Sequence, residues 1–118
     1  MGYRSDVAIM FNKKGMEVMP QDVKDELSEL AGDNITAFDE GDTLYRISGV
    51  KWYPSYEDVR KIKNFLSWLE NGYDSDDVEE EWPTYEFVRI GEEVGDEEHY
   101  GNNDEDKLFI SRTIEYID

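Results

Sequence analysis

The chain has 118 residues, of which 30 are acidic and 12 basic, and its formal net charge is -18 at pH 7. A protein of this charge repels nucleic acid and anionic membranes, so direct binding to either is not expected. It contains no cysteine, which excludes disulfides, thiolate metal sites and thiol catalysis.

The first predicted element is a strand over residues 3–11, in which apolar side chains alternate between two faces. One face carries Val7, Ile9 and Phe11, and the other carries Ala8 and Met10. Because both faces are apolar, this strand should lie inside a sheet rather than at its edge. A polar turn is expected to follow over residues 12–15.

A short helix is predicted over residues 21–31, with Pro20 placed at its start and Gly32 after its end. Its apolar stripe consists of Val23, Leu27 and Leu30. Residues 35–38 predict a brief strand. The turn at residues 39–42 should then return the chain antiparallel as a strand over residues 43–52.

The clearest helical period in the chain follows Pro54. Ser55 is expected to cap this second helix and Gly72 to end it. Its apolar stripe consists of Val59, Ile62, Leu66 and Leu69, widened by Phe65 and Trp68. Trp68 is expected in the core. The opposite face, together with Lys51, holds the basic cluster of Arg60, Lys61 and Lys63.

The last part of the chain predicts strands over residues 85–90 and 108–117, with acidic loops at about residues 73–83 and 91–106. The second loop is expected to be solvated. The element order predicts a single α+β domain over residues 1–118. Two helices should pack on one face of a four- to five-stranded, mainly antiparallel sheet, in a ferredoxin-like or split βαβ arrangement.

The residue pattern points away from catalysis. His99 is the single histidine, and no serine or cysteine is obviously paired with it, so a nucleophilic triad is not predicted. Carboxylates suit calcium or magnesium, but the spacing around Gly101 fails the calcium-loop pattern. No glycine-rich loop precedes a helix. We therefore predict no catalytic residue, metal site or cofactor, with a cation-dependent hydrolase as the least favoured alternative.

The acidic run, residues 74–81, carries six carboxylates over eight residues. Their spacing is roughly one per 2 Å if the run is helical and one per 4 Å if it is extended. Duplex DNA presents one charge per ~1.7 Å of axis. The run can therefore match the charge density of a phosphate backbone, while a solvated loop without a partner is the alternative.

The predicted partner-binding residues are the carboxylates of the two acidic loops, with two aromatic anchors between them. They are Asp74, Asp76, Asp77, Glu79, Glu80, Glu81, Trp82, Tyr85, Glu92, Glu93, Asp96, Glu97 and Glu98. The alternative for the aromatic residues is that they pack the second helix onto the sheet.

Two segments resemble a group of small acidic proteins encoded by bacteriophages and prophages. These are residues 2–7, reading GYRSDV, and residues 85–93, reading YEFVRIGEE, which precede an acidic stretch. Proteins of this kind often inhibit host machinery, and some anti-CRISPR proteins do so by occupying a nucleic-acid-binding surface. The resemblance implies a setting in an infected or lysogenic bacterium, and it assigns no site residues.

Charge and resemblance together predict a phage interaction protein that inhibits a host nucleic-acid-handling or defence complex by mimicking nucleic acid. Its partner should be a basic protein surface. An immunity or antitoxin-type protein that neutralises a basic toxin is the alternative. The N-terminal residues lack the pattern of a signal peptide, and no apolar stretch approaches the length of a membrane span. The expected location is therefore the cytoplasm.

Overall fold

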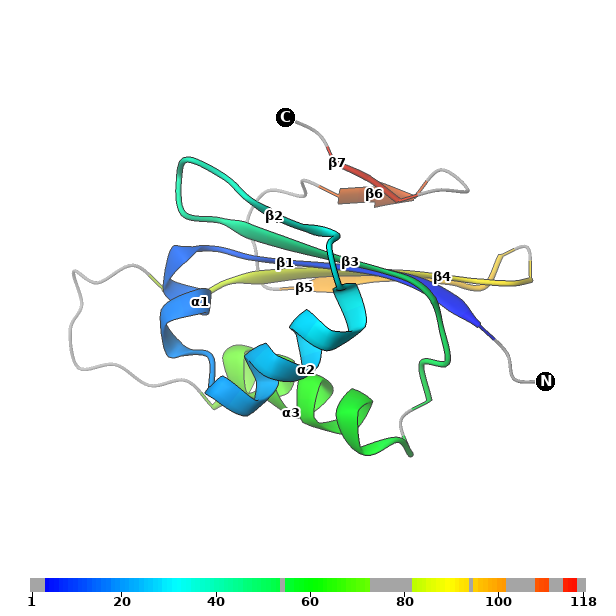
Figure 1. The fold of residues 1–118 in the computed structure, drawn as a ribbon, viewed down its shortest axis with the longest axis horizontal. Helices are drawn as coiled ribbons and strands as arrows, with labels where there is room; N and C mark the ends of the chain where they lie inside the picture. The colour runs from blue at the N-terminus through cyan, green and yellow to red at the C-terminus, as the bar shows by residue number, and fades with distance from the viewer. Residues whose placement is uncertain are drawn as a thin grey trace.

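The computed structural model describes residues 4–53, 55–72, 82–93, 95–101, 108–110 and 114–116, the last two ranges by backbone alone. A five-stranded sheet forms the centre, helices cover one face, and a separate two-stranded sheet lies on the other side (Figure 1). The α+β class and the helices on one face of a five-stranded antiparallel sheet are confirmed. The acidic run lies outside the described residues.

The elements follow one another along the chain without long connections in its first half. They are β1 (Ser5–Phe11), α1 (Lys13–Val18), α2 (Gln21–Ala31), β2 (Ile35–Ala37), β3 (Thr43–Val50), α3 (Glu57–Asn71), β4 (Tyr85–Gly91), β5 (Glu97–Gly101), β6 (Leu108–Ile110) and β7 (Ile114–Tyr116).

The main sheet has the order β2-β3-β1-β4-β5, and every neighbouring pair is antiparallel. Since β1 and β2 both run antiparallel to β3, they share one direction and have β3 between them. This is a split βαβ arrangement, in which α1 and α2 connect the two parallel strands. Strands β6 and β7 pair only with each other among the described residues.

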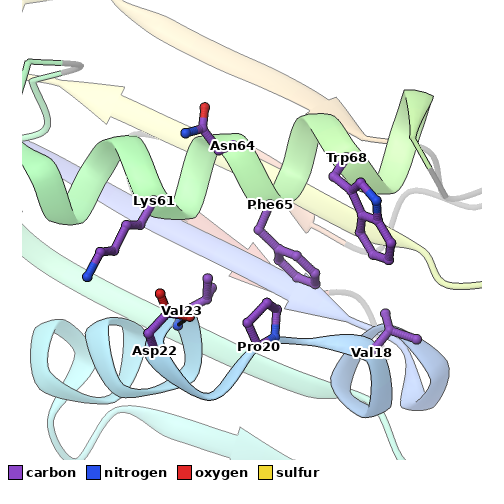
Figure 2. Close-up of a pocket in the computed structure, with 8 residues that line it drawn as sticks. All are labelled: Val18, Pro20, Asp22, Val23, Lys61, Asn64, Phe65 and Trp68. Carbon is purple, nitrogen blue, oxygen red and sulfur yellow. Dashed lines mark hydrogen bonds between the residues drawn. The ribbon is translucent and has the colours of Figure 1, made fainter.

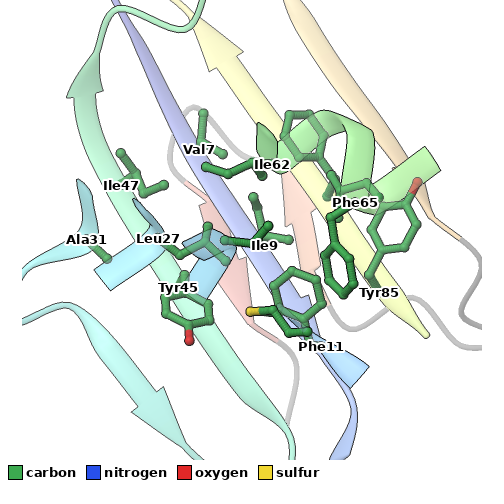
Figure 3. Close-up of a cluster of buried hydrophobic side chains, with 14 of the residues drawn as sticks. Val7, Ile9, Phe11, Leu27, Ala31, Tyr45, Ile47, Ile62, Phe65 and Tyr85 are labelled. Carbon is green, nitrogen blue, oxygen red and sulfur yellow. The ribbon is translucent and has the colours of Figure 1, made fainter. Parts of the chain in front are cut away.

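Strand β1 is central and apolar on both faces, as its sequence predicts. Val7, Ile9 and Phe11 face the helices and join the larger core, part of which Figure 3 shows. Ala8 and Met10 face the other way and pack in a second cluster with residues of β3 and β4. Figure 1 shows β6 and β7 on this second side, next to β1 and β4.

Helices α2 and α3 cover the first face because each presents one apolar stripe. From α2 the buried residues are Val23, Leu27 and Ala31, and from α3 they are Val59, Ile62, Phe65, Leu66 and Leu69. Pro20 is the N-cap of α2, and Gly72 ends α3 by donating its N–H to the Trp68 carbonyl at 2.8 Å. Ser55 does not cap α3, because the N-cap is Tyr56, which makes no side-chain cap bond.

Two segments that the sequence predicted to be loops contain regular secondary structure. The turn expected at residues 12–15 is the start of α1, because the Asn12 side chain accepts the Gly15 N–H at 2.7 Å and caps that helix. The acidic loop expected at residues 91–106 contains β5. Its polar residues pair across the strands with β4, as Arg89 lies opposite Glu98 and Phe87 opposite Tyr100.

The predicted C-terminal strand over residues 108–117 is also wrong as a single strand, because β6 and β7 form a hairpin outside the main sheet. Over the residues that the structure describes, no helix is both long and apolar enough to cross a bilayer.

Truncation of a buried isoleucine should test the packing of α3. Ile62 is fully buried, whereas Ile35 on β2 is 37% exposed. We expect Ile62→Ala to lower the free energy of unfolding by about 2–5 kcal/mol, since it leaves a cavity between helix and sheet. Ile35→Ala makes the same chemical change and should cost less than about 1 kcal/mol. Urea denaturation measures both, and equal losses would contradict this packing.

Candidate functional site

One group of predicted site residues gathers at the turn between β4 and β5. Arg89 donates to Asp96 and Glu98, each at 2.7 Å, and to the Ser5 hydroxyl at 2.9 Å. The guanidinium is 12% exposed, so these are short, charge-assisted bonds in a partly desolvated place. The carboxylates raise the pKa of Arg89 although its burial lowers it. Arg89 therefore neutralises part of the acidity of this turn.

A third carboxylate that the sequence predicted for partner binding makes a hydrogen bond within the chain at the same end of the sheet. Glu92 accepts the backbone N–H of Arg4 at 2.6 Å, and the Arg4 guanidinium donates to the Gly49 carbonyl at 2.8 Å. Asp6 accepts the Gly49 N–H at 2.8 Å. Glu92, Asp96 and Glu98 thus stabilise the chain, and this turn offers a partner less negative charge than its sequence suggests.

Tyr85 is the one predicted aromatic anchor that the structure removes from the surface. Its side chain is 1% exposed and packs in the core between α3 and the sheet. Burial, followed by a hydrogen bond to Glu70 and the charge of that carboxylate, raises the pKa of Tyr85 well above its usual 10. A residue in this position cannot contact a partner, because it already packs α3 onto β4.

Trp82, by contrast, is 50% exposed and is held in place by Asn12. The Asn12 amide donates to the Trp82 carbonyl at 2.9 Å, and its oxygen accepts the Thr84 N–H at 3.0 Å. The same oxygen caps α1 through Gly15. One side chain therefore fixes the first turn of α1 against the segment that leads into β4.

Trp68 was expected in the core, but it is 39% exposed. It lies at the end of α3, where its ring stacks on Phe65 at 5.9 Å with an interplanar angle of 22°. The core is already filled at this level by Phe65, which is 5% exposed. The wider apolar stripe of α3 thus extends past the core and onto the surface.

A cleft lies between α3 and the segment joining α1 to α2, with a volume of about 460 Å³ (Figure 2). Its apolar lining consists of Val18, Pro20, Val23, Phe65 and Trp68. Asp22 and Lys61 lie toward one end of the cleft, and Val18 and Trp68 lie toward the other. Clefts of this size and character are the usual binding sites of proteins.

The basic cluster of α3 is balanced in part within the molecule. Lys61 lies 3.9 Å from Glu26 of α2 and 3.9 Å from Glu57 one turn earlier in α3. Both pairs are long and solvated, so each contributes little stability. Their effect is to offset the positive charge that Lys61 brings to the cleft.

Helix α1 connects the two exposed tryptophans. Its N-cap, Asn12, holds Trp82, and its last residue, Val18, lines the cleft with Trp68. Six helical residues span about 9 Å. We call this region, formed by α1, Trp68 and Trp82, the tryptophan end. In sequence, the acidic run lies between Trp68 and Trp82.

A contact between a buried glutamate and a histidine on the opposite face of the sheet was missed by sequence reasoning. Glu86 is 1% exposed, and its carboxylate lies 2.6 Å from Nε2 of His99 on β5. An isolated glutamate within the apolar segment YEFVRI is the signal that could have revealed it, because a buried carboxylate needs a partner. Neither Glu86 nor His99 lines the cleft between α3 and the segment joining α1 to α2.

Metal binding finds no support in the geometry. The described side chains contain no group of three or more histidine, cysteine, aspartate or glutamate residues positioned to hold a metal ion.

Comparisons with known proteins place the chain in no family: no family model, no curated protein and no solved structure matches it.

Removal of the Asn12 side chain should loosen the tryptophan end. Asn12→Ala deletes the cap of α1 and both bonds to the segment before β4, and we expect it to lower the free energy of unfolding by about 1–3 kcal/mol. Asn71→Ala is a matched control, because Asn71 makes a single exposed bond to the Ser67 carbonyl at 3.3 Å. A shift of the Trp82 indole resonance in Asn12→Ala, and not in Asn71→Ala, would show that the segment around Trp82 has been released from α1. An unchanged free energy of unfolding in Asn12→Ala would contradict this role of Asn12.

Tyrosine ionisation should destabilise the fold at high pH. Burial, then the charges of Glu98 and Glu70, raise the pKa of Tyr100 to about 12, while an unfolded tyrosine ionises near pH 10. Because folded Tyr100 keeps its hydroxyl proton to higher pH than unfolded Tyr100 does, protonation of this hydroxyl contributes to the free energy of unfolding. This contribution is complete below pH 10 and is lost as the pH rises to about 12. We expect Tyr100→Phe to flatten this decline in urea denaturation. An identical slope would contradict the assignment.

Proposed function

We propose that this chain is an interaction protein that binds a basic surface of a host nucleic-acid-handling or defence complex and blocks it, as anti-CRISPR proteins of phages do. The observation that supports this proposal most directly is the arrangement of the tryptophan end. The two exposed tryptophans of the described surface flank, in sequence, a run of six carboxylates over eight residues.

In this proposal, charge accelerates the encounter with the partner, and aromatic contact slows its dissociation. A surface built for DNA or RNA carries lysine and arginine residues that release counterions when a polyanion binds. A net charge of -18 steers such a partner toward this chain and accelerates encounter. Rigid aromatic side chains at the point of contact then slow dissociation, since tryptophan is enriched among the residues that dominate binding energy.

The hydrogen bonds and ion pairs at the turn between β4 and β5 argue against a main role for this turn in the proposed function. Glu92, Asp96 and Glu98 hold Arg4 and Arg89, so they contribute less to a partner than the sequence alone suggests. The proposal therefore assigns the main role to the acidic run, with Trp82 as an anchor. Tyr85 plays no part, because it is buried.

Neutralisation of the acidic run should abolish binding to a basic partner. The variant replaces Asp76 and Asp77 with Asn and Glu79 and Glu80 with Gln, and its control makes the same four changes at exposed residues of α2 and the neighbouring loops. The control residues are Asp25, Glu29, Asp33 and Glu40. Each variant and the parent chain is titrated against purified CRISPR effector complexes and against basic nucleases, at low and at physiological salt.

We expect salt-sensitive binding by the parent and the control to at least one defence complex, with loss of at least tenfold in affinity for the run variant. Displacement of the chain by duplex DNA would show that both occupy one surface. Equal affinities for run variant and control would refute the proposal. Selective binding to a basic nuclease would instead favour an immunity protein.

A further inference from the structure

We propose that the cleft between α3 and the end of α1 receives an arginine side chain of the partner, stacked against Trp68. This inference rests on the proposed function for the identity of the partner as a basic protein. Beyond the proposed function, it names the type of partner residue that the cleft binds and the side chains of this protein that contact that residue.

The cleft has the right combination of surfaces for an amphipathic cation. Val18, Pro20 and Phe65 provide apolar contact for the three methylene groups of an arginine stem. Trp68 provides an aromatic face at the same end of the cleft (Figure 2). Guanidinium groups prefer tryptophan among the aromatic side chains, because its ring has the strongest negative face.

Trp68 is held in one position although it is 39% exposed. Phe65 supports it by stacking at 5.9 Å. Gly72 lies against its other edge, and a Cβ atom added there would come 2.6 Å from Cδ1 of the indole. Since no side chain at residue 72 could be accommodated without moving the ring, this glycine permits the observed orientation. An anchor already ordered in this way loses little entropy on binding.

The charge around this end of the cleft complements a cation. Glu17 is exposed and precedes Val18, and the acidic run follows α3 directly in sequence. Asp22 lines the other end of the cleft, the same end as Lys61. Lys61 opposes a cation, but it lies toward the far end of the cleft from Trp68, near Glu26 and Glu57. The volume of about 460 Å³ accommodates a long side chain with part of its backbone.

Arginine fits this environment better than lysine or an apolar residue. Its planar guanidinium stacks on an indole while its edge still donates to carboxylates, whereas an ammonium is a strongly hydrated point charge. A leucine would use the apolar lining and none of the charge.

The test uses the full chain and four capped tripeptides with glycine on either side of arginine, citrulline, lysine or leucine. Titrations are followed by the indole Nε1–H resonances of the three tryptophans and the methyl resonances of Val18 and Val23. We expect the arginine peptide to shift the resonances of Trp68 and Val18 and to bind more tightly than the other three peptides. Citrulline has nearly the shape of arginine but no charge, so its peptide measures the contribution of the charge.

Two variants test the role of Trp68. Trp68→Ala removes the aromatic face, and Gly72→Ala displaces the ring without deleting it. Each should weaken binding of the arginine peptide about twofold to fivefold, the contribution of one exposed cation–π contact. Tyr56→Ala is the matched control, because Tyr56 is an exposed aromatic residue at the start of α3 that does not line the cleft, and it should leave the affinity unchanged.

Equal binding of the arginine and citrulline or leucine peptides would overturn the inference, as would shifts that spare Trp68. These results are independent of the proposed function. Salt-sensitive binding to a defence complex that survives Trp68→Ala would refute the arginine cleft alone. Arginine binding at Trp68 in a chain that binds no basic complex would refute the proposed function alone.

Discussion

Strand β1 must be covered on both faces, and this requirement organises the rest of the chain. Its residues from Val7 to Phe11 are all buried, so water has to be excluded from each side of the sheet. Helices α2 and α3 exclude it on one side. On the other, Ala8 and Met10 pack with β3 and β4 next to the hairpin of β6 and β7. The antiparallel neighbours β3 and β4 satisfy the backbone of β1.

The excess of acidic residues constrains the fold in a second way. Like charges at the surface repel one another and oppose compaction. The structure reduces this repulsion where carboxylates lie closest together, by placing Arg89 between Asp96 and Glu98. Glu86, the one fully buried carboxylate of the described residues, has His99 beside it. Arg89 and His99 thus contribute to the stability of this acidic chain.

The sequence predicted the elements whose apolar period is long and regular. The range of α2, the central position of β1 and the end of α3 at Gly72 all follow from local spacing and end signals. It failed where a distant residue decides the local structure. Helix α1 depends on Asn12, which also bonds a segment close to β4, and β5 depends on cross-strand pairs with Phe87 and Arg89. Neither contact is visible in a window of the sequence.

The candidate site was predicted in the same uneven way. Trp82 lies at the surface, as expected of an anchor, but the sequence could not distinguish a buried tyrosine from an exposed one or a core tryptophan from a surface one. Tyr85 is buried because β4 is covered on both faces, and Trp68 is exposed because Phe65 already fills the core beneath it. The cleft joins residues of α1, α2 and α3, so only the tertiary structure could reveal it.

We propose that a basic partner binds at the tryptophan end. Backbone hydrogen exchange of the full chain, free and bound to a defence complex, would locate the bound surface. We expect added protection on α1, on the C-terminal turns of α3 and on residues 82–84. Protection confined to the turn between β4 and β5, or to the edge strand β2, would contradict it.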